Sequence, residues 1–309
     1  MLSCRTQTIY KVGIALGLLI SSSLSFLMGQ HVVYMEFKND FLNYKGDGTD
    51  KYYTAGVSSG GLIHLKKNTS HYLTISLSQK MFTPSNIVLE PEEIPPTDYP
   101  YAGLISFNMG YQIFNPSNTA YTKGEFSWGT TGPSSGARMI QRELHKIIGD
   151  REPHGWSTQV QLGNFIQVQL EHTRSIIKSS WMKINCVGNI QIGSIFNNLS
   201  LATELKIDKS SDPFIGQLSK HNQPSEKPRL SLWARPKLEY ILGNGLLETN
   251  QNQAGIHHRI INKFVYHSSV GISLQFNKFS ISLVQHTNSP EFKTATKHAF
   301  GEIAFQLNI

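Results

Sequence analysis

The sequence predicts an all-β protein: a twelve-stranded antiparallel transmembrane β-barrel with one short helix in an external loop. Apolar and polar residues alternate with a period of two through most of the chain. Twelve such segments can be counted, an even number as in single-chain bacterial barrels. Beyond residue 30, no window holds eighteen continuous apolar residues, which excludes a helical membrane protein.

The first thirty residues have the composition of a secretory signal peptide. Arg5 and Lys11 precede an apolar run from Val12 to Ile20, and a Ser-rich stretch follows it. We therefore expect residues 1–30 to be removed, leaving 31–309 as a single transmembrane β-barrel domain with its active site at the external rim.

Charge and cysteine content describe the expected mature chain further. The sequence has 28 Lys and Arg against 21 Asp and Glu, and losing Arg5 and Lys11 leaves a charge of about +5. This mild excess suits an anionic partner such as lipopolysaccharide and does not argue for nucleic acid. Loss of Cys4 leaves Cys186 as a lone thiol, so no intramolecular disulfide is expected.

The alternating faces distinguish a membrane barrel from a soluble sandwich. In residues 264–276 one face carries Phe264, Tyr266, Val270 and Ile272, while the other carries small and polar residues. A soluble sandwich places its apolar face inward and commonly uses shorter strands. Long strands with a small polar face are typical of a barrel with lipid outside and a polar lumen.

The predicted strands divide the chain into external and periplasmic connections. They are residues 31–38, 51–66, 71–79, 101–115, 120–128, 163–176, 181–192, 196–206, 231–243, 259–275, 279–288 and 298–308. With the N-terminus on the periplasmic side, 129–162 is the longest external connection. Segment 207–230 is long for a periplasmic turn, so it is either an unusual loop or a place where the strand count slips.

The longest external connection contains the predicted helix. In "GARMIQRELHKIIGDREPHGW", residues 136–156, apolar residues recur at helical spacing up to Gly149, a favoured helix end. Gln141 and His145 lie one turn apart on the same side of this helix. A lid or a packing plug would also account for a helix at this place.

Polar residues from other connections are predicted at the same rim. Asn39 and Asp40 close the first strand, Thr54 opens the second, and Asp98 precedes the fourth. With Gln141, His145 and Glu152 they supply a base, oxygen ligands and amide or hydroxyl donors in one layer. Rims are polar in any barrel, so each residue taken singly is more often solvated than functional.

Five motifs in order resemble the LpxR-type lipid A deacylases of the Gram-negative outer membrane. They are Asn39-Asp40, "YYTAGV" at 52–57, "DYPYAG" at 98–103, the Gln141/His145/Gly149 spacing followed by "GWSTQ", and "SPEF" at 289–292. The resemblance covers roughly residues 34–305. It implies a twelve-stranded barrel of the cell outer membrane that hydrolyses the 3′-acyloxyacyl ester of lipid A with the help of Ca²⁺.

The resemblance also implies roles for individual residues. His145 matches a catalytic histidine, and a neutral imidazole can take a proton from water at neutral pH. The other implied catalytic residues are Gln141, Asn39 and Thr54. Asp40 and Glu152 are the implied Ca²⁺ ligands, since this ion prefers oxygen donors. Asp98 and Tyr99 are the implied substrate-binding residues.

One departure from the family pattern keeps alternatives open. Tyr99 stands where the family has an arginine, which removes a bidentate phosphate contact. A non-catalytic barrel, acting as a channel or surface-binding protein, is therefore an alternative, and so is an outer-membrane phospholipase. The sequence does not determine the oligomeric state, the acyl-chain preference or the identity of the metal.

Overall fold

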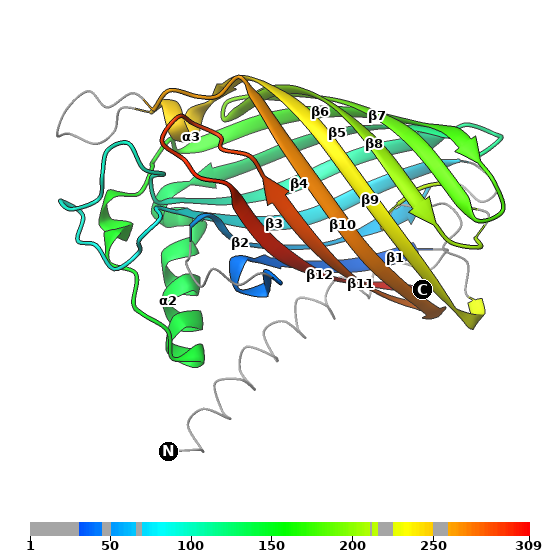
Figure 1. Cartoon of the computed structure of the whole chain (residues 1–309), viewed down its shortest axis with the longest axis horizontal. Helices are drawn as coiled ribbons and strands as arrows, with labels where there is room; N and C mark the ends of the chain where they lie inside the picture. Colours follow the sequence, from blue (N-terminus) through cyan, green and yellow to red (C-terminus); the bar gives the residue numbers. More distant parts are fainter. Residues whose placement is uncertain (1–30, 45–50, 66–69, 211, 216–224, 250–258) are drawn as a thin grey trace.

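Twelve antiparallel strands close into one barrel in the computed structural model (Figure 1). The structure describes residues 31–44, 51–65, 70–210, 212–215, 225–249 and 259–309. Each strand pairs with its neighbours in sequence, and β1 closes the barrel by pairing with β12. The predicted fold is confirmed, whereas the predicted signal peptide lies outside the described residues.

The observed strand bounds follow the predicted ones closely. The strands are β1 (His31–Asn39), β2 (Tyr52–His64), β3 (His71–Thr83), β4 (Ala102–Phe114), β5 (Ala120–Thr131), β6 (Asn164–Lys178), β7 (Met182–Gly193), β8 (Phe196–Ile207), β9 (Ser225–Asn244), β10 (Phe264–Asn277), β11 (Phe279–Asn288) and β12 (His298–Asn308).

Strand alternation separates a lipid-facing surface from a polar lumen. Along β4, Ser106 and Asn108 line an interior cavity, whereas Phe107 and Met109 are 45% and 47% exposed on the outside. A water-soluble barrel would not present such a belt of exposed apolar side chains, but a bilayer covers it.

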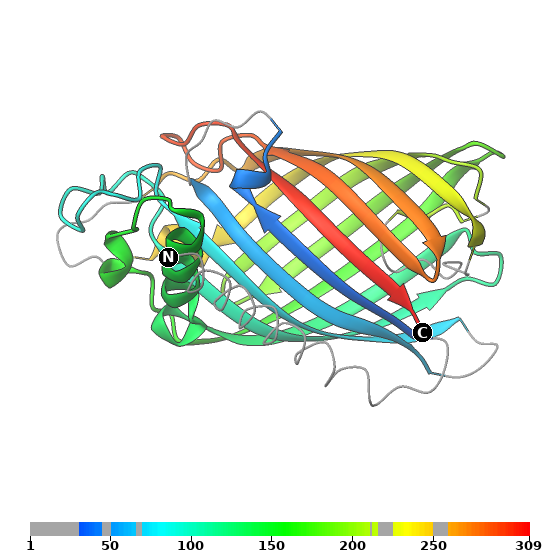
Figure 2. The ribbon, with the colours of Figure 1, turned by 90° about the horizontal axis from the view of Figure 1, so that it is seen from below.

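The helices gather at the end of the barrel that carries the long connections, which we take as the external end (Figures 1 and 2). They are η1 (Asp40–Leu42), η2 (Gly132–Ser135), α2 (Ala137–Ile148), η3 (Gly155–Thr158) and α3 (Gly245–Glu248). Among the described residues, every helix is too short or too polar to span a bilayer.

An apolar cluster fills the external mouth of the lumen. Tyr52, Phe82 and Tyr99 pack there against Phe292, and the cluster extends to Leu246 of α3. The Phe82 and Tyr99 rings stack at a centroid distance of 5.3 Å. Because these side chains are almost fully buried, the described part of the external mouth is packed with protein and is not an open pore.

The long segment after β8 is a loop and not a miscounted strand. β9 begins at Ser225, and residues 208–210 and 212–215 enter the lumen from the end opposite the helices. Phe214 is 2% exposed and packs against Phe114 and Tyr121. Asp208 forms buried ion pairs with Lys183 and Lys206. The loop is long because it folds into the barrel.

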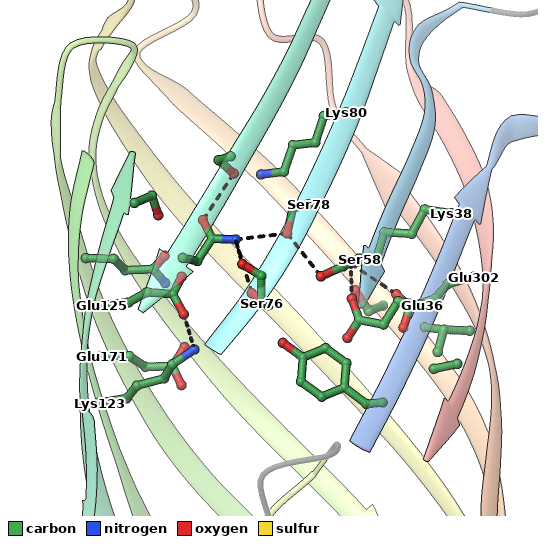
Figure 3. A pocket seen from close by; sticks show the side chains of 18 of the residues that line it. Glu36, Lys38, Ser58, Ser76, Ser78, Lys80, Lys123, Glu125, Glu171 and Glu302 are labelled. Atoms are coloured by element: carbon green, nitrogen blue, oxygen red, sulfur yellow. Dashed lines mark hydrogen bonds and ion pairs between the residues drawn. The ribbon is translucent and has the colours of Figure 1, made fainter. Parts of the chain in front are cut away.

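Between these two packed ends lies a cavity of about 450 Å³ lined by charged and hydroxyl side chains (Figure 3). Lys38 lies 3.3 Å from Glu36 and 3.4 Å from Glu302. Lys123 pairs with Glu125 at 2.6 Å. Most of the charge in the lumen is therefore neutralised within it.

Candidate active site between a helix and the barrel wall

Helix α2 packs on the outer surface of the barrel wall and does not enter the lumen. Met81 and Gly103 alternate with the cavity-lining Lys80 and Leu104, so they face outward. A Cβ on Gly103 would lie 2.5 Å from the Cβ of Ala137, so only glycine permits this approach. Met81 belongs with Ala137 to an apolar cluster that joins the wall and the helix. The alternative of a lumen plug is thereby excluded for α2.

The side chain of His145 is oriented by the end of its own helix. Gly149 has a φ of 78°, and the backbone N–H groups of Gly149 and Asp150 both donate to the His145 carbonyl. This turn brings the Arg151 carbonyl to 2.6 Å from His145 Nδ1. A carbonyl can only accept, so Nδ1 carries the proton, and in the neutral ring Nε2 is the basic nitrogen.

His145 is 6% exposed and Gln141 is 2% exposed, so both lie against the protein and not in open solvent. Gln141 Oε1 accepts a hydrogen bond from the Trp156 indole N–H at 2.6 Å. Trp156 is itself buried against Tyr101, at a ring centroid distance of 4.9 Å. The structure thus shows that Gln141 and His145 share the inner side of α2, and it adds Trp156 as the hydrogen-bond donor to Gln141.

Asn39 and Thr54 reach the same outer face of the wall. Asn39 is at the outward position after the cavity-lining Lys38, and it pairs in register with Ala55. Ala55 packs in the cluster that holds Ala137 of the helix. The β2–β3 register shifts between Tyr53 and Ala55, so Thr54 occupies a bulge.

The bulge turns the Thr54 hydroxyl to within 2.5 Å of the Thr83 hydroxyl. Thr83 continues the outward positions of β3, and both threonines are buried. Thr83 is not among the site residues predicted from the sequence, although it lies two residues beyond Met81 and so follows the same alternation. Asn39 caps η1, its Oδ1 accepting from the Phe41 N–H at 2.7 Å.

The two expected calcium ligands have different surroundings. Asp40 is 7% exposed, and its carboxylate accepts from the backbone N–H groups of Phe41 and Lys51 at 2.8 and 3.2 Å. Glu152 is exposed and lies 3.7 Å from Arg142. Among the described residues, no group of three or more His, Cys, Asp or Glu side chains is placed to hold a metal. Calcium binding by Asp40 and Glu152 stays a prediction.

The two expected substrate-binding residues support the loops of the external mouth. The Asp98 carboxylate accepts from the backbone N–H and the hydroxyl of Ser85, at 2.9 and 2.5 Å. Tyr99 is 1% exposed inside the apolar cluster. Burial raises the pKa of Tyr99 well above its usual range, and the charge of Glu291 raises it further. Contact of either residue with substrate stays a prediction.

Comparisons with known proteins agree with this fold. The family described as "Outer membrane protein LpxR" matches residues 14–309. LpxR from Salmonella typhimurium has a similar structure, with a TM-score of 0.77 at 18% identity, covering 90% of this chain and 100% of that chain. A comparison with curated protein sequences finds no match.

Two autotransporter domains are similar to a lesser degree. The β domain of Bordetella BrkA has a TM-score of 0.47 at 6% identity, covering 90% of this chain and 98% of that one. The NalP translocator domain of Neisseria meningitidis has a TM-score of 0.46 at 11% identity, covering 98% of this chain and 97% of that one.

Because the family match spans nearly the whole sequence, the chain belongs to the LpxR family of outer-membrane lipid A deacylases.

Proposed function

We propose that this protein hydrolyses the 3′-acyloxyacyl ester of lipid A in the outer leaflet, with His145 as the general base. The observation that carries the proposal is the contact between His145 Nδ1 and the Arg151 carbonyl. It fixes the tautomer in which Nε2 can accept a proton from water. The attacking water then adds to the ester carbonyl, and the proton on Nε2 passes to the departing alcohol oxygen.

The position of α2 explains how one molecule can be both anchored in lipid and exposed to water. The helix covers outward positions of β2, β3 and β4 at the external end of the barrel. A lipid A molecule beside this wall keeps its acyl chains in hydrocarbon while its sugar ester lies at the level of the helix. The Gln141 amide and the Asn39 and Thr54 side chains supply hydrogen-bonding groups for the water and the ester.

Calcium dependence is part of the proposal. Asp40 would hold the ion together with backbone carbonyls and waters, since Ca²⁺ takes six to eight oxygen ligands. When bound, the ion would supply positive charge to the developing oxyanion. Glu152, which lies beside Arg142, would be the second carboxylate ligand.

Mass spectrometry of lipid A tests the proposal directly. Lipid A is compared from cells with the protein, cells without it, and cells with His145→Asn, each with added calcium or with a chelator. We expect loss of the 3′-acyloxyacyl group only with the unsubstituted protein and calcium. Unchanged lipid A in every sample would favour a non-catalytic barrel, and fatty acid released from phospholipids in the same extracts would favour the phospholipase alternative.

A further inference from the structure

A groove of about 440 Å³ lies beside α2, between η2, the first two turns of the helix and η3. Arg138, Arg142, Trp156 and Gln159 are among the residues that line it. None of the five motifs of the family resemblance includes either arginine. The groove borders the packed contact between α2 and the barrel wall, since Trp156 belongs to both.

Two arginines give the groove its positive charge. Arg138 and Arg142 are four residues apart, so their side chains lie one above the other on the helix. Arg138 makes no ion pair or hydrogen bond with any residue that the structure describes. Arg142 lies 3.7 Å from Glu152, and both side chains are largely exposed, so that ion pair is weak. Both guanidinium groups are available to an anion, which they can bind in a bidentate manner.

Gln159 adds a hydrogen-bond acceptor to the groove. Its side chain is only 6% exposed, and its Nε2 donates to the Trp156 carbonyl at 3.1 Å. Its Oε1 is buried and has no partner among the described residues. A buried acceptor without a donor is unfavourable, and a hydroxyl group of a ligand would satisfy it. An anionic group beside a hydroxyl donor is the chemistry of a sugar phosphate or a sugar acid.

The groove adjoins the candidate active site through Trp156. This residue lines the groove, and its indole N–H donates to Gln141 on the inner side of α2. Arg142 is three residues before His145, so the two are neighbours on the helix surface. A molecule whose ester lies at His145 can therefore extend its saccharide into the groove.

We propose that this groove binds an anionic sugar of the lipopolysaccharide through Arg138 and Arg142, with Gln159 Oε1 accepting from a sugar hydroxyl. The assignment of the sugar to lipopolysaccharide rests on the proposed function, but the binding itself does not need turnover. The anion is either a lipid A phosphate or the carboxylate of an attached acidic sugar.

Calorimetric titration of the full-length barrel in detergent micelles tests the proposal. The probes are an N-acetylglucosamine phosphate, glucuronate and neutral N-acetylglucosamine. We expect an anionic probe to bind more tightly than the neutral sugar. Arg138→Ala should raise the Kd of that anionic probe about tenfold. Lys146→Ala is the matched control, because Lys146 is an exposed cation of the same helix paired with Glu143.

The choice of probe identifies the source of the anion. Tighter binding of the phosphate points to lipid A itself, and tighter binding of glucuronate points to an acidic core sugar. Anionic probes that bind no better than the neutral sugar, or an Arg138→Ala variant that binds like the unsubstituted protein, would overturn the proposal. A change in electrophoretic mobility on heating verifies that each variant is folded. Absence of ester hydrolysis with binding intact would reject only the proposed function.

Discussion

The lumen and the outer wall beneath α2 use polar residues in opposite ways. The cavity in the lumen is lined by four acidic and four basic side chains, namely Glu36, Glu125, Glu171, Glu302, Lys38, Lys80, Lys123 and Arg235. The outer site has one imidazole, the Asp40 carboxylate, and several amides and hydroxyls. In the lumen opposite charges neutralise each other, whereas at the wall side chains such as His145, Gln141 and Asp40 are held by hydrogen bonds to neutral groups.

The candidate active site of this barrel is therefore not the region with the highest density of ionisable groups. Lys38, Lys123 and Arg235 each lie within 4 Å of a carboxylate that also faces the lumen. The Lys38–Glu36 and Lys123–Glu125 pairs each lie within one strand, and the Arg235–Glu171 pair joins β9 to β6. Together they fill the barrel with polar contacts. His145 differs because its partner, the Arg151 carbonyl, accepts from Nδ1 and so selects the tautomer of the neutral ring in which Nε2 is the basic nitrogen. Orientation is the property that distinguishes the outer site.

The largest expected effect comes from removing the imidazole. His145→Asn should lower the rate of lipid A deacylation by about a thousandfold, since a general base contributes a factor of roughly 10² to 10⁴. The barrel should still insert and show heat-modifiable mobility, because α2 is a surface helix. Release of fatty acid from purified lipid A is the measurement.

His154→Asn is the matched control for that variant. His154 lies in the same connection but is exposed and 2.9 Å from Glu90. Its substitution should leave the rate unchanged. Undiminished deacylation by His145→Asn would remove the distinction between the outer site and the rest of the rim.

The next effect is on stability and arises in the lumen. Lys183 is fully buried and donates to the Asp208 carboxylate and to its carbonyl, the latter at 2.8 Å. Lys183→Met leaves Asp208 with Lys206 alone and should cost about 3 to 5 kcal/mol. The heat-modification temperature, at which heating unfolds the barrel and changes its electrophoretic mobility, should fall. The specific activity of the folded protein should be retained. Lys178→Met, an exposed lysine at the same end, serves as the control.

Acid should act on the same lumen cluster. Burial alone would raise the pKa of Asp208, but Lys206 at 3.2 Å and hydrogen bonds from Lys183 and Ser231 hold it well below its usual range. A depressed folded pKa contributes stability that is lost as the pH falls below the unfolded value of about 3.9. The heat-modification temperature should therefore drop below this pH, and less so in Asp208→Asn. An equal drop in both proteins would contradict this account.

The sequence was sufficient to predict the barrel and the helix because both depend on periodicity. Alternation with a period of two predicted the bounds of the twelve strands to within a few residues. The helical spacing of apolar residues up to Gly149 predicted the end of α2. It also placed Gln141 and His145 on one side of the helix. The largest error in a strand boundary, at the start of β9, lies beside the loop that enters the lumen.

The contacts of the site could not be predicted because they depend on register and on a bulge. The outward direction of Thr54 follows from the shift between Tyr53 and Ala55, which alternation alone does not reveal. Trp156 meets Gln141 only because the chain returns after the helix. The neighbours of Glu152 and Asp40 likewise depend on how their connections fold: Glu152 lies beside Arg142, and Asp40 accepts from the Lys51 N–H.

Trp156→Phe should have a smaller effect on the outer site. It keeps the aromatic packing against Tyr101 but removes the donor to Gln141 Oε1, so kcat should fall about tenfold while KM changes little. Trp128→Phe, on the lipid-facing side of β5 and 57% exposed, is the control. If only the folding yield changed and kcat per folded molecule did not, Trp156 would be structural and would not position Gln141.

The smallest effect is expected at the glycine that ends α2. Gly149→Ala introduces a Cβ that meets nothing within 4 Å, so its cost is the left-handed φ of 78° alone, about 1 kcal/mol. Relaxation of this turn would move the Arg151 carbonyl from His145 Nδ1 and lower kcat roughly threefold. Gly149→Asn should retain more activity, because asparagine tolerates this conformation better than alanine. Equal kcat for Gly, Asn and Ala at this position would show that the carbonyl contact does not depend on the turn, and the orientation argument would then rest on the burial of His145 alone.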